Sequence, residues 1–297
     1  MAILPRKKDP IDSAFLAELD GLRMLARKVF RGQMRGERRS RNKGQSVEFV
    51  DFRPYIQGDD LRRIDWHTYG RLERFFIKLF EEEEDLRLYV ILDCSASMDY
   101  GTPDKFDHAR KLTAALAYIV LANLETVAVS VFAGHYAMLS TPTRGKGRIH
   151  PLLRKLNDLE ARGPSSLGGA AARFAAQTRK SGVVCVLSDF LTGERLETIA
   201  PLAGLGHQVE LIQILAPEEA NPQLAGDLEL VDAETGATEE VSMGQAVLRR
   251  YHQRLGALQA ELKTFARRCG GDFHVCVTSQ PLREFILGPL RTARLVR

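Results

Sequence analysis

The chain has 297 residues, of which 44% are hydrophobic and 27% charged, with 24 glycines, 12 prolines and a formal net charge of +4. These proportions are those of a folded domain and exclude a collagen, a coiled coil and a chain that is disordered throughout. The length is enough for one large α/β domain with an appended segment, or for two small domains.

The first part of the chain predicts an extension that precedes the main domain. Apolar residues at spacings of three and four across residues 12–33 predict an amphipathic helix whose opposite face is basic. A polar stretch at 36–46 predicts a loop, and the alternation over 47–55 predicts a short strand. We assign this helical and β extension to residues 1–86, and the main domain to residues 87–297.

From residue 87 onward, uncharged apolar runs alternate with helical patterns. A mostly parallel sheet covered by helices on both faces produces this alternation, so the sequence predicts a doubly wound α/β fold. Strands are expected at 88–92, 126–132, 136–140, 183–187, 208–215 and 273–277, and helices at 104–124, 147–159, 165–180, 194–202 and 245–269. Between the last two parallel strands, apolar residues flank Thr235 and Gly236, which predicts an inserted hairpin near residues 226–242 at the edge or surface.

Other features of the sequence bear on the cellular compartment. The longest uncharged stretch, residues 126–143, is broken by a Gly-His pair and predicts two strands rather than a membrane helix. The charged N-terminus lacks the apolar core of a signal peptide. The four cysteines include no C-x-x-C pair, and Cys94 and Cys185 lie in apolar runs, where cysteine is usually a small buried hydrophobe. We expect a cytoplasmic protein without a disulfide framework or structural zinc.

Oxygen-bearing side chains gather where the predicted strands end. These residues are Asp93, Ser95 and Ser97 in a D-x-S-x-S pattern, Ser165 before a predicted helix, and Asp189 after the strand at 183–187. Ligands of open parallel sheets bind beyond the carboxyl ends of the strands. A carboxylate with hydroxyls two and four residues later can direct three oxygens to one point, which suits a hard cation such as Mg²⁺. The alternative is that the serines cap a helix and Asp93 is a turn residue.

This arrangement resembles the metal-ion-dependent adhesion site of von Willebrand factor A domains. The resemblance rests on the D-x-S-x-S loop, on Gly163-Pro164-Ser165-Ser166-Leu167 where that family has G-G-T-[ND]-[IL], and on Ser188-Asp189-Phe190 where it has T-D-G. The resemblance implies that Asp93, Ser95, Ser97, Ser165 and Asp189 bind Mg²⁺ or Mn²⁺. Serine keeps the hydroxyl of the family's threonine, whereas Phe190 replaces a small residue.

A longer motif precedes these residues. It consists of Phe52-Arg53-Pro54-Tyr55, Gly58-Asp59-Asp60-Leu61-Arg62, Ile64-Asp65-Trp66, Tyr69, Arg71 and the acids Glu81 to Glu84. The motif is similar to the Y-x-x-G-D-D-x-R-x-I-D-W signature of the bacterial domain-of-unknown-function family fifty-eight. That resemblance implies a von Willebrand A-like domain that acts with a MoxR-type AAA+ ATPase as an adaptor or chaperone-like partner.

The same motif also has a purely structural interpretation. Its acids and arginines surround Trp66, the only tryptophan of the chain, and such opposite charges form rigid polar clusters around an indole. We therefore expect Trp66 to be a core or interdomain anchor. The acidic run at 81–84 is open to two interpretations, a solvated strand edge or a surface complementary to a basic partner.

The sequence favours a non-enzymatic protein-binding module, in which the five residues hold Mg²⁺ and a partner's carboxylate completes the coordination. One alternative is a metal-dependent phosphohydrolase, because an aspartate at a strand end can be a phosphoryl nucleophile. A haloacid-dehalogenase-like site, however, would have an acid where this chain has Ser95. The sequence also contains no Walker loop, H-E-x-x-H or G-x-S-x-G motif.

A second alternative is nucleic-acid binding through the basic N-terminal segment. Its cations are Arg23, Arg27, Lys28, Arg31, Arg35, Arg38, Arg39, Arg41 and Lys43. Such a density of charge can neutralise phosphates, but aromatic residues that would stack on bases are nearly absent from it. A solvated basic face is the simpler interpretation, and we expect no membrane insertion.

Overall fold

The computed structural model describes residues 19, 22, 24, 47–56, 61, 64–82, 86–293 and 295–296. The chain divides into two compact units. Residues 86–297 and 1–28 form the larger unit, and residues 29–85 form the smaller unit. The predicted boundary between residues 86 and 87 therefore lies next to the point where the larger unit resumes.

Residues at the start of the chain were predicted to belong to the extension, but Leu22 and Met24 contact the larger unit. Met24 forms an antiparallel bridge with Val296, and the side-chain amide of Asn123 donates to the carbonyl oxygen of Leu22 at 2.7 Å. The helix predicted over 12–33 is wrong at Leu22 and Met24, because pairing with the C-terminus overrides the local apolar spacing. Most of that predicted helix, the predicted loop at 36–46 and the basic residues considered for nucleic-acid binding lie outside the described residues.

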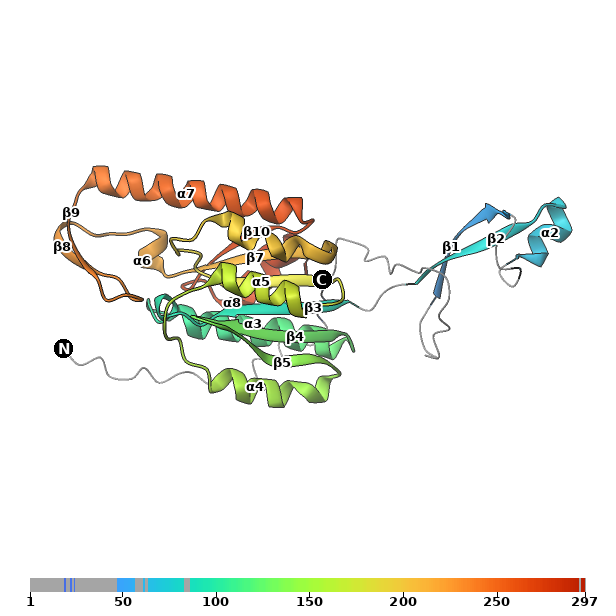
Figure 1. Cartoon of the computed structure of the whole chain (residues 1–297), viewed down its shortest axis with the longest axis horizontal. Helices are drawn as coiled ribbons and strands as arrows, with labels where there is room; N and C mark the ends of the chain where they lie inside the picture. Colours follow the sequence, from blue (N-terminus) through green and yellow to red (C-terminus); the bar gives the residue numbers. More distant parts are fainter. Residues whose placement is uncertain are drawn as a thin grey trace. The chain divides into compact units, whose positions relative to one another are not determined.

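A six-stranded sheet forms the centre of the larger unit (Figure 1). Its strands are β3 (Arg87–Asp93), β4 (Thr126–Phe132), β5 (Tyr136–Arg144), β6 (Val183–Ser188), β7 (Gln208–Leu215) and β10 (Phe273–Val277). They lie in the order β10-β7-β6-β3-β4-β5, and only the β4–β5 pair is antiparallel. Counted from β3, this is the 3-2-1-4-5-6 order of a doubly wound sheet, so the predicted fold class is confirmed.

Helices cover both faces of this sheet. They are α3 (Lys105–Ala122), α4 (Ile149–Asn157), α5 (Leu167–Gln177), α6 (Pro217–Ala220), α7 (Gln245–Arg268) and α8 (Leu282–Phe285), with 3₁₀ turns at Ala96–Met98 (η2), Lys146–Arg148 (η3) and Leu196–Gly206 (η4) and a π-helical turn at Ile286–Leu290 (η5). In Figure 1, α7 and α4 lie on opposite sides of the sheet. Every residue of β6 and β7 is buried, as parallel strands covered on both faces require.

One predicted helix has a different form. Residues 194–202 were expected to be α-helical, but the chain makes 3₁₀ turns over Leu196–Gly206. Pro201 lies inside this segment, and proline lacks the N–H that an α-helical ladder needs. The segment still places Ile199 and Leu202 in the core, against α5 and α7.

The inserted hairpin is present where it was predicted. Its strands are β8 (Gly226–Val231) and β9 (Thr238–Met243), which pair antiparallel between β7 and α7. Cys94 and Cys185 are buried, as expected, and all four cysteines are free. Among the residues that the structure describes, no helix is both long enough and apolar enough to cross a membrane.

The smaller unit contains a two-stranded sheet and a short helix. β1 (Val47–Pro54) pairs antiparallel with β2 (Phe76–Glu82), and α2 (Trp66–Leu72) lies between them in the chain. The side chain of Asp65 caps α2, accepting hydrogen bonds from the His67 N–H at 3.0 Å and the Thr68 hydroxyl at 2.8 Å.

The expectation that Trp66 is a buried anchor is wrong, since 63% of its surface is exposed. Asp65 turns inward to cap the helix, and the next residue is directed outward on a helix that buries none of its residues. The Trp66 indole makes edge contacts with the rings of Tyr69 and Phe75, at centroid distances of 6.1 and 6.4 Å.

Candidate functional site

The candidate site lies at the switch point of the sheet. β3 is flanked by β6 on one side and β4 on the other, so the chain leaves β3 and β6 towards opposite edges of the sheet. Ligands of doubly wound folds bind at this point, beyond the carboxyl ends of the strands. Asp93 is the last residue of β3 and Asp189 directly follows β6. The structure thus brings the two predicted acids to one edge.

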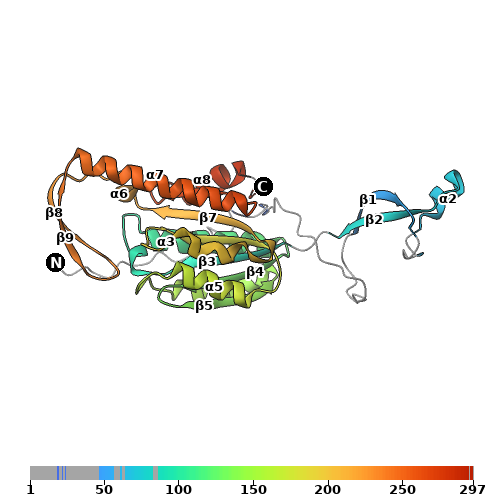
Figure 2. The same cartoon turned by 45° about the horizontal axis from the view of Figure 1, so that its top comes forward.

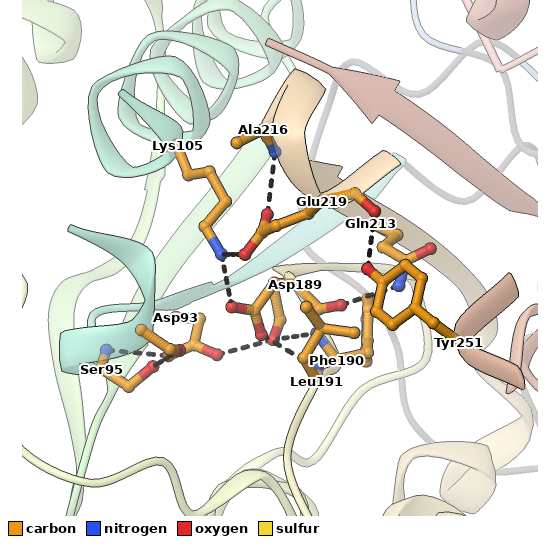
Figure 3. Close-up of polar contacts among 12 residues, drawn as sticks. Asp93, Ser95, Lys105, Asp189, Phe190, Leu191, Gln213, Ala216, Glu219 and Tyr251 are labelled. Carbon is orange, nitrogen blue, oxygen red and sulfur yellow. Dashed lines mark hydrogen bonds and ion pairs between the residues drawn. The ribbon is translucent and has the colours of Figure 1, made fainter. Parts of the chain in front are cut away.

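Asp93 is fully buried, and both of its carboxylate oxygens accept hydrogen bonds. Oδ1 accepts from the Ser95 N–H at 2.9 Å, and Oδ2 accepts from the Ser188 hydroxyl at 2.6 Å (Figure 3). Burial raises the pKa of Asp93 to about 7, and these bonds oppose the rise only in part. A carboxylate this deeply buried is stabilised in its charged form by a nearby cation.

Two of the predicted serine ligands lie next to each other on the loop after β3. The hydroxyl oxygens of Ser95 and Ser97 are 3.1 Å apart. Ser95 precedes η2 but makes no side-chain capping bond, whereas the side chain of Asp104 caps α3 by accepting from the Asp107 N–H. The alternative in which these serines cap the following helix is therefore not supported at Ser95.

Ser165 lies on a neighbouring loop that is tied to the first. The Arg162 N–H donates to the Cys94 carbonyl oxygen, and the Ala96 N–H donates to the Gly163 carbonyl oxygen, both at 2.8 Å. The Ser165 hydroxyl oxygen is buried and has no hydrogen-bond partner within the described parts of the chain. Buried hydroxyls are normally hydrogen-bonded, so the Ser165 hydroxyl is available to a ligand at this loop.

Asp189 already binds a cation that belongs to the chain. The ammonium of Lys105 lies 2.8 Å from Asp189 Oδ2 and 2.6 Å from Glu219 Oε1 (Figure 3). Lys105 and Asp189 are 0% and 1% exposed. Burial lowers the pKa of Lys105, but the charges of Asp189 and Glu219 outweigh this effect, so its pKa is raised and the ammonium stays protonated.

Further hydrogen bonds hold this ion-paired group in place. The backbone N–H of Leu191 donates to Asp189 Oδ1 at 3.0 Å, and the Gln213 amide donates to the Asp189 carbonyl oxygen at 2.8 Å. The Tyr251 hydroxyl of α7 donates to the Glu219 carbonyl oxygen at 2.6 Å. The candidate site is therefore linked to α6 and α7 as well as to the sheet.

Lys105 was not predicted as a residue of the site. Lys105 is the first residue of α3. Because the N-terminus of a helix disfavours positive charge, a lysine there needs acidic partners. That mismatch is the only local signal that could have identified it. Glu219 was also missed, because its contact with Lys105 joins residues far apart in the chain.

Phe190 adopts a backbone conformation that explains why a small residue is usual at this position of the motif. Its φ is +55°, in the left-handed region that favours glycine. The ring is only 3% exposed and packs in the core with Leu167, Ile199 and Leu202. Burial of the ring offsets the backbone cost and directs the side chain away from solvent.

The donor set fits a hard cation, with one difference from the prediction. Three serine hydroxyls and the Asp93 carboxylate offer the oxygen ligands that Mg²⁺ and Mn²⁺ prefer. Among the described residues, no group of three or more His, Cys, Asp or Glu side chains could hold a metal ion. For such an ion, hydroxyls would therefore supply most of the ligands. Because Lys105 neutralises Asp189, that acid adds little net charge to the site.

Comparisons with known proteins identify the family. The family described as "Protein of unknown function DUF58" matches residues 51–261. The "Uncharacterized protein Rv1480" of Mycobacterium tuberculosis is 27% identical over 267 residues, which cover 87% of this chain and 83% of that protein.

Two solved structures are similar to parts of this chain. The conserved hypothetical protein BatB from Bacteroides thetaiotaomicron has a TM-score of 0.45 at 14% identity, covering 70% of this chain and 98% of that one. The SpRpn10 VWA domain has a TM-score of 0.37 at 17% identity, covering 44% and 76%. These likenesses assign no activity to this chain. Since the family match spans more than half of its length, the chain belongs to the DUF58 family.

Proposed function

We propose that the chain is a protein-binding module that uses a divalent cation to hold an acidic side chain of its partner. Ser95, Ser97 and Ser165 would bind Mg²⁺ or Mn²⁺ together with Asp93, and Asp189 would anchor the site through Lys105. The observation that supports this most directly is the buried Ser165 hydroxyl, which has no partner within the described residues.

The ion would leave a coordination position for the partner. Mg²⁺ takes about six oxygen ligands and usually keeps several waters, so a site with few protein ligands can accept an external carboxylate. We propose a MoxR-type AAA+ ATPase or its substrate as the partner, on the basis of the family resemblance. The ion then supplies charge at the contact, and the serine loops fix its position.

The arrangement favours binding over phosphoester hydrolysis. Both oxygens of Asp93 are engaged in hydrogen bonds, which weakens them as nucleophiles, and Ser95 stands where a second acid would be expected. The Asp189 carboxylate is paired with Lys105. In this proposal the chain therefore acts by binding and not by catalysis.

Isothermal titration with Mg²⁺ and with Mn²⁺ tests the proposed ion. Wild type should bind one ion per chain, and Ser95→Ala should bind it at least about tenfold more weakly, because a ligand is lost. Ser140→Ala is the control, since among the described residues its hydroxyl bonds only the neighbouring Thr141 carbonyl oxygen on the edge strand β5. Equal affinities of Ser95→Ala and wild type, or no binding by wild type at millimolar Mg²⁺, would contradict the proposal.

A further inference from the structure

The inserted hairpin returns to the candidate site. It leaves the sheet after β7, and Figures 1 and 2 show it at the end of the sheet where α6 lies and α7 begins. At its tip, a carboxylate oxygen of Glu234 accepts a hydrogen bond from the backbone N–H of Ser165 at 2.9 Å. Ser165 is the residue whose hydroxyl oxygen is buried without a partner in the described chain. An acid of the chain therefore already lies at the loop that is proposed to hold the ion.

The shape of the tip is fixed by its own hydrogen bonds. Asp232 Oδ1 accepts from the Glu234 N–H at 3.0 Å, the Thr235 N–H at 2.7 Å and the Thr235 hydroxyl at 2.8 Å. Gly236 closes the turn with a φ of +71°, and its N–H donates to the Asp232 carbonyl oxygen at 2.9 Å. Between residues 231 and 240, only Glu234 is partly buried, and the others are exposed. The tip thus presents one carboxylate to the body of the domain.

Glu234 is not needed as a cap for α5. The first turn of that helix is already served by Glu194, whose carboxylate accepts from the Gly168 N–H at 2.7 Å. Glu234 instead bonds Ser165, which precedes the N-cap residue Ser166. Glu234 is therefore placed to contact the proposed ion-binding loop and not to cap α5.

We propose that Glu234 is an internal ligand of the site, which takes the place of the partner's carboxylate until an acidic partner displaces the hairpin. This inference rests on the proposed function, because it assigns to Glu234 the role that the proposal gives to a partner acid. The occupant that competes with the hairpin is a protein side chain of Asp or Glu type. The exposed strands β8 and β9 leave the hairpin free to move when its tip is released.

A different role for Glu234 would be to fasten the hairpin by a single hydrogen bond. The two roles differ in their response to the ion. An internal ligand couples hairpin closure to Mg²⁺ binding, so each must strengthen the other by the same factor. If Glu234 only fastens the hairpin, Mg²⁺ does not change hairpin closure.

Hydrogen exchange of the hairpin amides, measured on the full chain with and without Mg²⁺, separates these roles. Mg²⁺ should slow exchange over residues 226–243 by about tenfold in wild type, within the usual range of coupling between sites. Glu234→Gln keeps an oxygen that can accept from the Ser165 N–H but loses the charge, and Mg²⁺ should no longer slow its hairpin exchange. Glu239→Gln, a change at an exposed acid of β9, should behave as wild type.

Isothermal titration of the same proteins makes the outcomes distinguishable. We expect Glu234→Gln to bind Mg²⁺ more weakly than wild type but still measurably. If Mg²⁺ binds wild type and slows hairpin exchange equally in Glu234→Gln, or in neither protein, the inference is overturned and the proposed function stands. If wild type binds no Mg²⁺, both are overturned.

Discussion

At the scale of single residues, Lys105 sets this site apart from a simple cluster of acids. Its ammonium is buried and pairs with both Asp189 and Glu219. Removing one member of a buried ion pair leaves an uncompensated charge, which costs far more than the intact pair contributes. The three side chains therefore act as one unit that holds the end of β6, the start of α3 and α6 together.

Replacement of Lys105 by methionine should destabilise the larger unit strongly. The buried Asp189 and the partly buried Glu219 would lose their counterion, so we expect the free energy of unfolding to fall by about 3–5 kcal/mol. Urea denaturation measures this change. Lys111→Met is the control, since Lys111 pairs with Asp107 near the surface, and its loss should be below about 1 kcal/mol. Similar losses in the two variants would show that the Lys105 pairs are not energetically special.

His108 makes the fold sensitive to acid. Its Nε2 lies 3.3 Å from the Cys276 sulfur, and burial, with the charge of Lys111, lowers the pKa of His108 to about 4 although Asp107 opposes this. The unfolded chain takes up a proton at His108 below about pH 6.5 while the fold does not until about pH 4, so stability is lost as the pH falls through this window.

The contribution of His108 should lower the free energy of unfolding by about 2 kcal/mol at about pH 5, relative to neutral pH. His108→Gln should remove this contribution. Urea unfolding of both proteins at the two pH values measures the difference, because carboxylates elsewhere titrate equally in both. An acid-induced loss of the same size in wild type and His108→Gln would show that His108 is protonated in the fold.

At the scale of secondary-structure elements, the larger unit could be predicted well and the smaller unit poorly. β6 and β7 are buried on both faces, so their sequences are continuously apolar and indicate parallel strands. α2 and β2 were not predicted. α2 buries none of its residues, and β2 runs into the acidic stretch, so neither shows a regular apolar spacing.

The site could be predicted in part, for a related reason. The rule that ligands bind beyond strand ends identified Asp93 and Asp189, and the spacing of the loop identified Ser95. Lys105, Glu219 and Glu234 reach the site from other elements through tertiary contacts. Such contacts leave no local pattern in a single sequence, so these three residues could be found only in the structure.

The loop after β6 provides a prediction about backbone conformation. Phe190 has a φ of +55° and a buried ring, so removing the ring costs core packing whatever replaces it. Phe190→Ala should lose about 3–5 kcal/mol of unfolding free energy. Phe190→Gly should be more stable than Phe190→Ala by about 1 kcal/mol, because glycine adopts the left-handed conformation freely. Thermal and urea unfolding compare the two, and an alanine variant at least as stable as the glycine variant would contradict this backbone conformation.

At the scale of the whole molecule, the family motif and the candidate ion site lie in different units. Ile64 and Asp65 of the motif are buried in the smaller unit, where Ile64 bridges to Ile77 and Asp65 caps α2. The serine loops and the hairpin belong to the larger unit. Variants in the motif can therefore be used to separate effects on the smaller unit from effects on ion binding.

In the proposed function, serine hydroxyls of the larger unit hold one divalent ion. Titration of the chain with Mn²⁺, followed by electron paramagnetic resonance, counts bound ions directly. Wild type should bind one Mn²⁺ that Mg²⁺ displaces, and Ser165→Ala should lose this binding. The neighbouring Ser166→Ala should retain it, because this change leaves the Ser165 hydroxyl in place and removes no capping bond from α5. Retention of Mn²⁺ by Ser165→Ala with wild-type affinity, or its absence from wild type, would contradict the account.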